Sequence, residues 1–228
     1  MYYPYMPPQN RQQKGRTMKV TGTATVSAEP NLVIIQLAIV TENNELTQAQ
    51  QENAQKVEKV IQSLLQLGIP RENIQTAAYT IHPHYDYVDG KQVFSGYEVT
   101  HALTVRIENI DQAGVIIDTA VQNGVNRVSN VDFTVRNSQK YYQQALRAAL
   151  ENATAKAETI AETIDVTLDP HPIRIVEEAN EQPIVYQTFA VAKENTSTQL
   201  EPGQITFSAS VRVKFQYYVY LSLPFFAA

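Results

Sequence analysis

Hydrophobic and polar residues alternate in several segments of the chain, and this alternation predicts β-strands. Residues 19–28 place apolar or small residues on one side and Thr or Ser on the other. Residues 204–216 alternate in the same way, with Ile, Phe, Ala and Val opposite Thr, Ser, Arg and Lys. Residues 32–41 are apolar on both sides, which is typical of a strand in the interior of a sheet. Residues 125–136 and 173–189 are further expected strands, the second interrupted near residues 177–183.

Three other segments repeat their apolar residues every three or four positions, which predicts helices over residues 46–67, 111–123 and 138–164. The first has Asn44 or Thr47 as an expected N-cap and ends at Gly68, with Pro70 just beyond. The third is long and Ala-rich. Because alanine has little bulk, its apolar stripe permits close approach of another helix or of a sheet.

Residues 68–107 organise the expected fold as a β-hairpin. Strands over residues 74–87 and 91–107 flank the Asp89-Gly90 dipeptide, a strong signal for a two-residue hairpin turn. From residue 32 the order is therefore β-α-β-β-α-β, the ferredoxin-like order of an antiparallel sheet with two helices on one face. The expected class is α+β, with an N-terminal strand before this unit and the Ala-rich helix and a C-terminal strand pair after it.

The chain is expected to divide into three parts. Residues 1–17 are rich in Tyr, Pro and Gln without periodicity and are read as a flexible arm, or as an aromatic arm that docks on a neighbouring subunit. Residues 18–217 form the α+β domain. Residues 218–228 form an apolar tail, buried either within the domain or in a subunit contact.

Composition excludes several classes of function. The net charge is −5 with pI near 5.4, which argues against a nucleic-acid partner. Cysteine is absent, so disulfides, thiolate nucleophiles and thiolate metal sites are excluded. The chain lacks the apolar run of about 18 residues that a membrane-spanning helix needs. It also lacks an apolar leader in residues 1–17, so a cytoplasmic protein is expected, with the cell envelope or surface as the alternative.

Catalytic motifs are missing from the sequence. It contains no G-x-S-x-G elbow, H-E-x-x-H, Walker A or G-x-G-x-x-G motif, and its carboxylates show no spacing that marks an acid–base pair. We therefore expect no catalytic residue, no cofactor and no enzymatic activity.

His82 and His84 are the candidate metal ligands. An H-x-H pair in a strand projects both imidazoles from one face, and Asp86 continues that face. Against a metal site stand Pro83 between them and the lack of a fourth ligand, since the partner strand offers only His101. Two surface histidines are the expected case, and a metal or small-ligand site on this hairpin is the alternative.

Aromatic residues are the candidate interface. Tyrosine is enriched at interfaces because it combines apolar area with a polar tip. Filling of the local core is the alternative role. The interface candidates are Tyr85, Tyr87, Phe94 and Tyr97 on the hairpin, and Tyr218, Phe225 and Phe226 in the tail.

Several short motifs in this order resemble the SIMPL-domain family, which includes bacterial envelope and periplasmic immunogenic proteins linked to oxidative stress. The motifs are Gly68-Ile69-Pro70-Arg71-Glu72-Asn73-Ile74-Gln75-Thr76, Pro83-His84-Tyr85, Gly96-Tyr97-Glu98, Val105-Arg106-Ile107, Gly124-Val125-Asn126-Arg127-Val128, Ala153-Thr154-Ala155-Lys156-Ala157 and Pro202-Gly203-Gln204-Ile205. The resemblance covers residues 18–217. Two features depart from it: exported members start with a signal peptide instead of this arm, and the tail lies outside the family pattern.

The resemblance implies an α+β domain that, in some members, assembles into large ring- or channel-like homo-oligomers. It carries over no catalytic residue and no cofactor. We therefore expect a non-enzymatic, homo-oligomerising structural or stress-associated protein whose partner is itself. The alternative is a small-ligand or metal-binding module built on His82 and His84.

Overall fold

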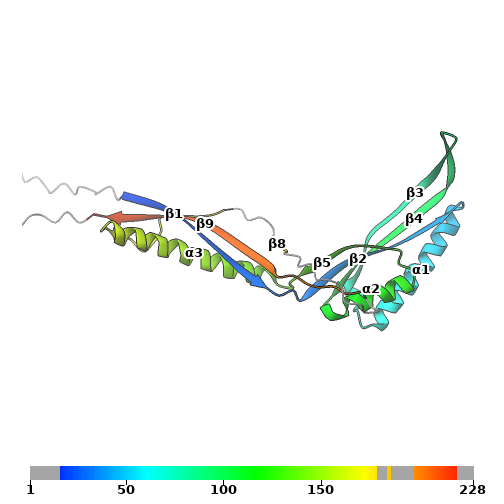
Figure 1. The fold of residues 1–228 in the computed structure, drawn as a ribbon, viewed down its shortest axis with the longest axis horizontal. Helices are drawn as coiled ribbons and strands as arrows, with labels where there is room; N and C mark the ends of the chain where they lie inside the picture. Colours follow the sequence, from blue (N-terminus) through cyan, green and yellow to red (C-terminus); the bar gives the residue numbers. More distant parts are fainter. Residues whose placement is uncertain (1–15, 179–183, 186–197, 220–228) are drawn as a thin grey trace, which may run out of the picture. The chain divides into compact units, whose positions relative to one another are not determined.

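The computed structural model describes residues 16–178, 184–185 (backbone only) and 198–219, and they fall into two compact units. The hairpin unit holds the described residues of 27–138 and 184–206 (Figure 1). The long-helix unit holds those of 1–26, 139–183 and 207–228. Antiparallel strand pairing together with helices in the described chain confirms the expected mixed class.

The hairpin unit is built on a four-stranded antiparallel sheet. Its elements are β2 (Leu32–Asn43), α1 (Leu46–Gln66), η1 (Arg71–Asn73), β3 (Ile74–Val88), β4 (Lys91–Ile107), η2 (Ile110–Gln112), α2 (Ala113–Gln122) and β5 (Arg127–Thr134). The strand order is β3-β4-β2-β5. β2 therefore has a neighbour on each side, which confirms the interior position expected from its apolarity on both faces.

The core of this unit lies between the sheet and the two helices α1 and α2. It joins the apolar residues of β2 and β4 to those of both helices: Val33, Ile35, Leu37, Ile39, Val57, Val60, Leu64, Leu103, Val105, Ile107, Ile116, Ile117 and Ala120. Three polar side chains of this unit, Thr41, Asn53 and Ser63, are also buried, and Asn53 ties helix to sheet. Asn53 of α1 donates from Nδ2 to the carbonyls of Ile39 (2.9 Å) and Val99 (3.1 Å).

The ends of α1 test the capping expectations. Gly68, with φ +83°, terminates the helix as expected, and the next amide, that of Ile69, donates back to the carbonyl of Leu64 (3.1 Å). The expected N-cap at Asn44 or Thr47 is wrong. Glu45 occupies the N-cap position without a side-chain cap bond. Asn43 at the end of β2 accepts the Glu45 amide instead (2.9 Å), because the strand delivers the chain directly into the helix.

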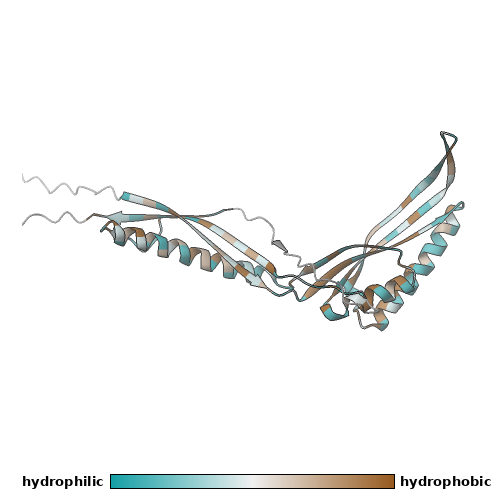
Figure 2. Ribbon diagram, in the orientation of Figure 1, coloured by the Kyte–Doolittle hydropathy of each residue, from teal (hydrophilic) through white to brown (hydrophobic). Residues whose placement is uncertain are grey.

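The long-helix unit packs one helix along a sheet. Its elements are β1 (Arg16–Ala28), α3 (Ser138–Thr163), β6 (Thr167–Leu168), β7 (Arg174–Glu177) and most of β9 (Ile205–Tyr218). β9 pairs with β1 on one side and with β6 and β7 along its length. Alternate β9 residues, including Val211, Val213 and Phe215, are buried against α3, and Figure 2 shows the matching alternation of hydrophobic and hydrophilic positions along this strand.

The helix meets this sheet through alanine. Ala145, Ala149, Ala153, Ala157 and Ala161 are the buried residues of α3. Across from them lies Gly22 of β1. A Cβ on Gly22 would lie 2.0 Å from the Ala149 carbonyl oxygen and 2.7 Å from the Ala153 Cβ. The missing side chain at Gly22 therefore sets how closely β1 approaches α3.

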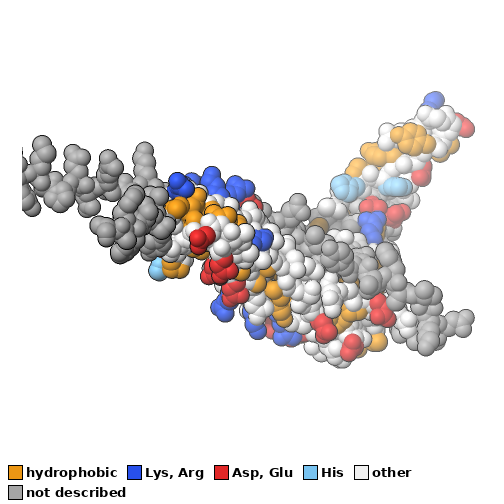
Figure 3. All heavy atoms as spheres, turned by 60° about the vertical axis from the view of Figure 1, so that its left-hand side comes forward, with side chains coloured by type: hydrophobic (Ala, Val, Ile, Leu, Met, Phe, Trp, Pro, Cys, Tyr) orange, Lys and Arg blue, Asp and Glu red, His pale blue; other side chains and the backbone are white. Residues whose placement is uncertain are grey.

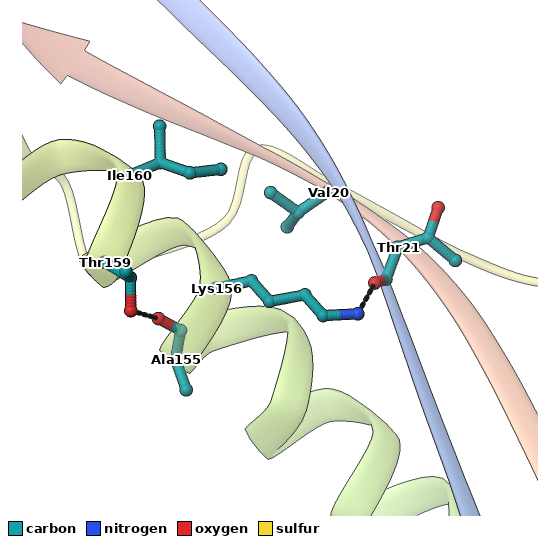
Figure 4. Close-up of a pocket in the computed structure, with 6 residues that line it drawn as sticks. All are labelled: Val20, Thr21, Ala155, Lys156, Thr159 and Ile160. Atoms are coloured by element: carbon teal, nitrogen blue, oxygen red, sulfur yellow. Dashed lines mark hydrogen bonds between the residues drawn. The ribbon is translucent and has the colours of Figure 1, made fainter. Parts of the chain in front are cut away.

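Side chains of α3 also protect the outer edge of β1 (Figure 4). Lys156 Nζ donates to the Thr21 carbonyl (2.9 Å). The Thr23 amide donates to Asn152 Oδ1 (3.2 Å). A shallow pocket of ≈ 390 Å³ lies here, lined by Val20, Thr21, Ala155, Lys156, Thr159 and Ile160. Two backbone groups that another strand would use for pairing are thus occupied.

Several sequence expectations shift at the ends of the chain. β1 begins at Arg16, so two residues assigned to the N-terminal arm belong to a strand. The strand expected over 173–189 is represented by β7 and by β8 (Ile184–Val185), which pairs with Thr206 and Ile205 of β9. Residues 1–15, 179–183, 186–197 and 220–228 lie outside the described residues. Among the helices that are described, none is long and apolar enough to cross a membrane.

Candidate functional site

The candidate site is the tip of the β3–β4 hairpin, which we define as residues 83–96. Its turn is Asp89 (φ +48°) and Gly90 (φ +76°), closed by the pair of Val88 and Lys91. Positive φ at both central residues is what a two-residue type I′ turn requires, and its twist matches that of the flanking strands. The hairpin expected from the Asp-Gly dipeptide is confirmed.

The tip extends past the end of the four-stranded sheet (Figure 1). The pairing of β2 with β4 runs as far as Asn43 opposite Tyr97. Beyond that pair β3 and β4 continue to Val88 opposite Lys91 with only each other as partners in the described chain. The tip is therefore a two-stranded ribbon, a form that is marginally stable in water without further packing.

A bulge marks the place where the ribbon leaves the sheet. His84 pairs with Gly96, and the next residue, Tyr85, pairs with Phe94. Ser95 is therefore left without a paired residue, and the register shifts by one residue. Gly96 has φ +147°, and a Cβ there would lie 2.8 Å from the Asn43 carbonyl oxygen. Glycine is required at this position both for the backbone angle and for the contact with the end of β2.

Three aromatic side chains form a continuous row on one face of the ribbon. The rings of Tyr85 and Phe94 meet edge to face with centroids 5.8 Å apart, and those of Phe94 and Tyr97 with centroids 5.2 Å apart. We call Tyr85, Phe94 and Tyr97 the aromatic row. Tyr85 is 43% exposed and Phe94 47% exposed, and nearby Tyr87 is 76% exposed. Figure 3 shows hydrophobic side chains running along this arm.

The outer rings of the aromatic row lie outside the buried core of the hairpin unit. Tyr97, beside the end of β2, is partly buried, but the outer rings contact each other rather than the core described above. Exposed apolar area of this kind, gathered on one element, marks a contact surface in soluble proteins. The assignment of these residues to an interface stays a prediction.

The structure brings His84 near Asp86 and leaves His101 elsewhere. His82 lies opposite Glu98 and His84 opposite Gly96, so both imidazoles share a face, and both side chains are exposed. His84 Nε2 lies 3.8 Å from Asp86 Oδ1. In the part of the chain that the structure describes, no group of three or more His, Asp or Glu residues is placed to hold a metal ion.

His101 belongs to the opposite face of the sheet. Its ring meets the Tyr79 ring edge to face at 5.4 Å, and its Nε2 lies 3.0 Å from Thr76 Oγ1. Partial burial lowers the pKa of His101 from its ordinary value of 6.5, because burial disfavours the charged imidazolium. His101 therefore supports the hairpin from the helix side and contributes nothing to the face of His82 and His84.

The tail candidates are divided by what the structure describes. Tyr218 ends β9 opposite Thr167 in the long-helix unit and is 39% exposed. Phe225 and Phe226 lie outside the described residues. The role of the tail in a subunit contact stays a prediction.

Sequence reasoning missed one cluster of charge. Lys19 of β1, Arg174 of β7, and Arg212 and Lys214 of β9 line a pocket of ≈ 280 Å³ in the long-helix unit. The alternation of residues 204–216 placed Arg212 and Lys214 on a face that meets water. It held no information on which cations from the other strands would join them, because strand pairing decides that.

Comparison with known proteins matches this chain to one family and to relatives without an assigned activity. Residues 18–215 match the sequence model of SIMPL, described as a protein of unknown function (DUF541). The chain is 28% identical over 211 residues to the 26 kDa periplasmic immunogenic protein of Brucella melitensis, covering 86% of this chain and 83% of that protein. It is 26% identical over 144 residues to the uncharacterized protein YggE of Escherichia coli K12, covering 63% of this chain and 58% of that protein.

These comparisons correct the expected location. A cytoplasmic protein was expected because residues 1–17 lack an apolar leader. The Brucella relative is named periplasmic, and this points to an exported protein rather than a cytoplasmic one. The expectation of a cytoplasmic protein relied on one missing signal in residues 1–17 and is wrong.

Proposed function

The chain belongs to the SIMPL family, and we propose that it is a non-enzymatic structural protein that assembles with further copies of itself through the tip of the β3–β4 hairpin. The observation that carries this proposal is the aromatic row, which stands exposed on a two-stranded ribbon beyond the end of β2. The stress association comes from the family resemblance alone.

The energetics of the ribbon favour a covered state. Full burial of a large apolar side chain contributes about 1.5–3 kcal/mol. Tyr85 and Phe94 are already about half covered, so complete burial of each adds roughly 1 kcal/mol, and that of Tyr87 roughly 2 kcal/mol. One contact of this size is weak. When two tips cover each other, this burial free energy is gained on both subunits. A closed assembly repeats the contact at every subunit.

A second copy of the chain is the partner that this surface fits. β3 has β4 as its one strand partner among the described residues, so beyond Ile74, whose carbonyl accepts from Arg71, its outer edge presents backbone groups without a strand partner. An antiparallel pair of identical edges obeys two-fold symmetry, in which the same patch serves both subunits. The tip carries Asp86, Asp89 and Lys91, so two copies approach without a large field of one sign.

The finer architecture of the hairpin unit supports a scaffold role. We infer a ferredoxin-like arrangement, because the chain order β2-α1-β3-β4-α2-β5 combines with the sheet order β3-β4-β2-β5. Such a fold hosts many unrelated functions, so the assignment rests on the hairpin and not on the fold. The periplasmic name of the Brucella relative supports an assembly in the cell envelope.

The native mass of the full chain tests this proposal. We expect light scattering coupled to size-exclusion chromatography at micromolar protein to give a mass well above 25.6 kDa. The double variant Tyr85→Ser/Phe94→Ser is expected to shift the mass towards that of the monomer. Its matched control is Val115→Ser/Val121→Ser, which removes two exposed apolar side chains from α2 in the same unit.

Three results separate the outcomes of this experiment. Circular dichroism should show that both double variants fold, because none of the four side chains belongs to the core. A monomeric unaltered chain contradicts the proposal. Equal loss of mass in the α2 control contradicts the assignment to the hairpin tip and leaves assembly through another surface.

A further inference from the structure

The long-helix unit holds a site that is separate from the hairpin and independent of assembly. We propose that the pocket lined by Lys19, Arg174, Arg212 and Lys214 binds the phosphate group of an anionic ligand. We call it the basic pocket. Figure 3 shows Lys and Arg side chains gathered over this part of the molecule.

Three neighbouring strands place these cations on one face. β7 pairs with β9 so that Arg174 lies directly opposite Lys214, and Val176 directly opposite Arg212. Val211 and Val213 alternate with Arg212 and Lys214 along β9 and are buried against α3, so Arg212 and Lys214 project from the opposite face of the sheet.

Lys19 joins this face from the third strand. It precedes Val20 of β1, which is buried in the same cluster as the alanines of α3, so the side chain of Lys19 projects away from the helix. The strand β9 separates Lys19 from Arg174, yet all four cations line one pocket. The basic pocket is thus made by pairing of segments that are about 150 residues apart in the sequence.

Among the described residues, only one carboxylate, that of Glu178, forms an ion pair with any of the four cations of the basic pocket. Glu178 accepts a hydrogen bond from Ser210 Oγ (2.9 Å) and is ion-paired with Arg212. The adjacent Glu177 accepts from the Tyr142 hydroxyl. Across the described part of the chain, no ion pair involves Lys19, Arg174 or Lys214.

This concentration of charge has a cost in the unliganded protein. Like charges directly opposite each other on paired strands destabilise the pair, and Arg174 and Lys214 stand in that relation. The chain as a whole is acidic, with a net charge of −5, so the excess of positive charge in the basic pocket is a local feature. A bound anion removes the repulsion, and a local cost that ligand binding relieves is typical of functional sites.

Charge and size select the ligand chemistry. Three cations without a carboxylate partner exceed what one carboxylate ligand neutralises and suit a phosphate dianion or a pyrophosphate. The guanidinium of Arg174 offers paired donors that match two phosphate oxygens, and the two lysines add point charges. The pocket of ≈ 280 Å³ is at the small end of ligand sites, which favours a head group over a large molecule. Val176 gives it one apolar wall.

Two sources can supply such a group: a soluble phosphate ester and the head group of an anionic lipid. Calorimetric titration of the full chain at low ionic strength with inorganic phosphate and with pyrophosphate tests the shared chemistry, because salt screens exposed charges over about 10 Å at 0.1 M. Co-sedimentation with phosphatidylcholine vesicles, with and without phosphatidylglycerol, tests the lipid source. Capture by the phosphatidylglycerol vesicles that pyrophosphate reverses assigns the lipid head group, and phosphate binding without capture assigns a soluble ester.

Matched charge variants locate the site. Lys214→Gln is expected to weaken pyrophosphate binding about tenfold, the loss of one charge-assisted hydrogen bond, and Arg174→Gln is expected to weaken it more, because it removes paired donors. Arg147→Gln removes one exposed cation from α3, outside the pocket lining, and is expected to change binding less than twofold. In ligand-free protein Arg174→Gln should raise the melting temperature relative to Arg147→Gln, because it removes the repulsion from Lys214.

The proposal is overturned by any of three results. The first is no measurable heat with millimolar phosphate or pyrophosphate at low salt. The second is equal weakening by Arg147→Gln, which would show a general response to charge. The third is binding of a single-stranded oligonucleotide that Arg174→Gln and Lys214→Gln leave intact while phosphate does not bind, which would place an anion surface elsewhere.

Discussion

Gly22 is the position where one methyl group has the most direct consequence for the fold. In Gly22→Ala the added Cβ would lie 2.0 Å from the Ala149 carbonyl oxygen and 2.7 Å from both the backbone nitrogen and the Cβ of Ala153. Two of these three atoms belong to the backbone of α3, so no side-chain rotation relieves the contact. The helix must move away from β1 as a body.

The size of the effect follows from that displacement. Contacts below 3.0 Å are essentially never seen for real Cβ atoms, so the strand and helix must separate locally by about 1 Å. A gap of that size forfeits a quarter to a half of the dispersion attraction along the alanine stripe. It also strains the hydrogen bonds of Lys156 to Thr21 and of Thr23 to Asn152. Overpacking costs about 1–3 kcal/mol, and we expect about 3 kcal/mol here because backbone atoms must give way.

Native-state hydrogen exchange followed by mass spectrometry is the appropriate assay, because the chain has two compact units. A loss of about 3 kcal/mol should speed exchange of α3 and β1 amides roughly a hundredfold. Amides of β2 and β4 should be unaffected. Gly68→Ala is the control. Its Cβ meets nothing within 4 Å, so the substitution only forces alanine into a φ of +83°, which costs about 1–2 kcal/mol of stability. Faster exchange should then be confined to α1. Unchanged exchange of α3 in Gly22→Ala would refute the close-packing argument.

Three further predictions concern polar groups of the hairpin unit. Asn53→Ala removes two hydrogen bonds to buried carbonyls and should lower the free energy of unfolding by about 2–3 kcal/mol in urea denaturation, whereas a loss below about 0.5 kcal/mol would show that neither bond matters. The lowered pKa of His101 means that the folded unit favours the neutral ring, so this stabilisation is present above pH 6.5 and is lost as the pH falls from 6.5 to the folded pKa. His101→Gln should flatten this part of the pH profile. Hydrogen bonds from the hydroxyl and amide of Thr198 lower the pKa of Asp118 below 3.8, so their stabilisation is present above that pH and lost as pH falls through the folded pKa. The Thr198 amide resonance should titrate below pH 3.8, and Asp118→Asn should abolish that titration.

Local pattern was a reliable guide to elements and a poor guide to their capping. The Asp89-Gly90 turn, the end of α1 at Gly68 and the interior position of β2 all follow from residues close together in the sequence, and the structure confirms each. The N-cap of α1 was missed. The N-cap residue, Glu45, makes no side-chain cap bond, and its own amide donates to Asn43 at the end of the preceding strand, which the residues around the helix start did not indicate.

The hairpin shows the same division within one element. Its strands, its turn and its aromatic content can be read from the alternation of residues 74–107. That β2 stops pairing at Tyr97, and that the ribbon continues alone from there, depends on where the chain turns into α1. Tyr85 and Phe94 are exposed because β2 ends before it reaches their part of β4. Composition carries no information on this, so it left a role in the local core open as the alternative.

By itself, the sequence determined the elements, the antiparallel α+β class and the family, because alternation, helical periodicity and turn chemistry are local properties of the chain. The tertiary structure alone decided which side chains meet. The basic pocket draws on β1, β7 and β9, whose residues are far apart in sequence and adjacent only through strand pairing. The close contact at Gly22 likewise exists only because α3 returns to β1 after more than a hundred residues. Such contacts are set by long-range pairing and packing, and a local pattern carries no record of them.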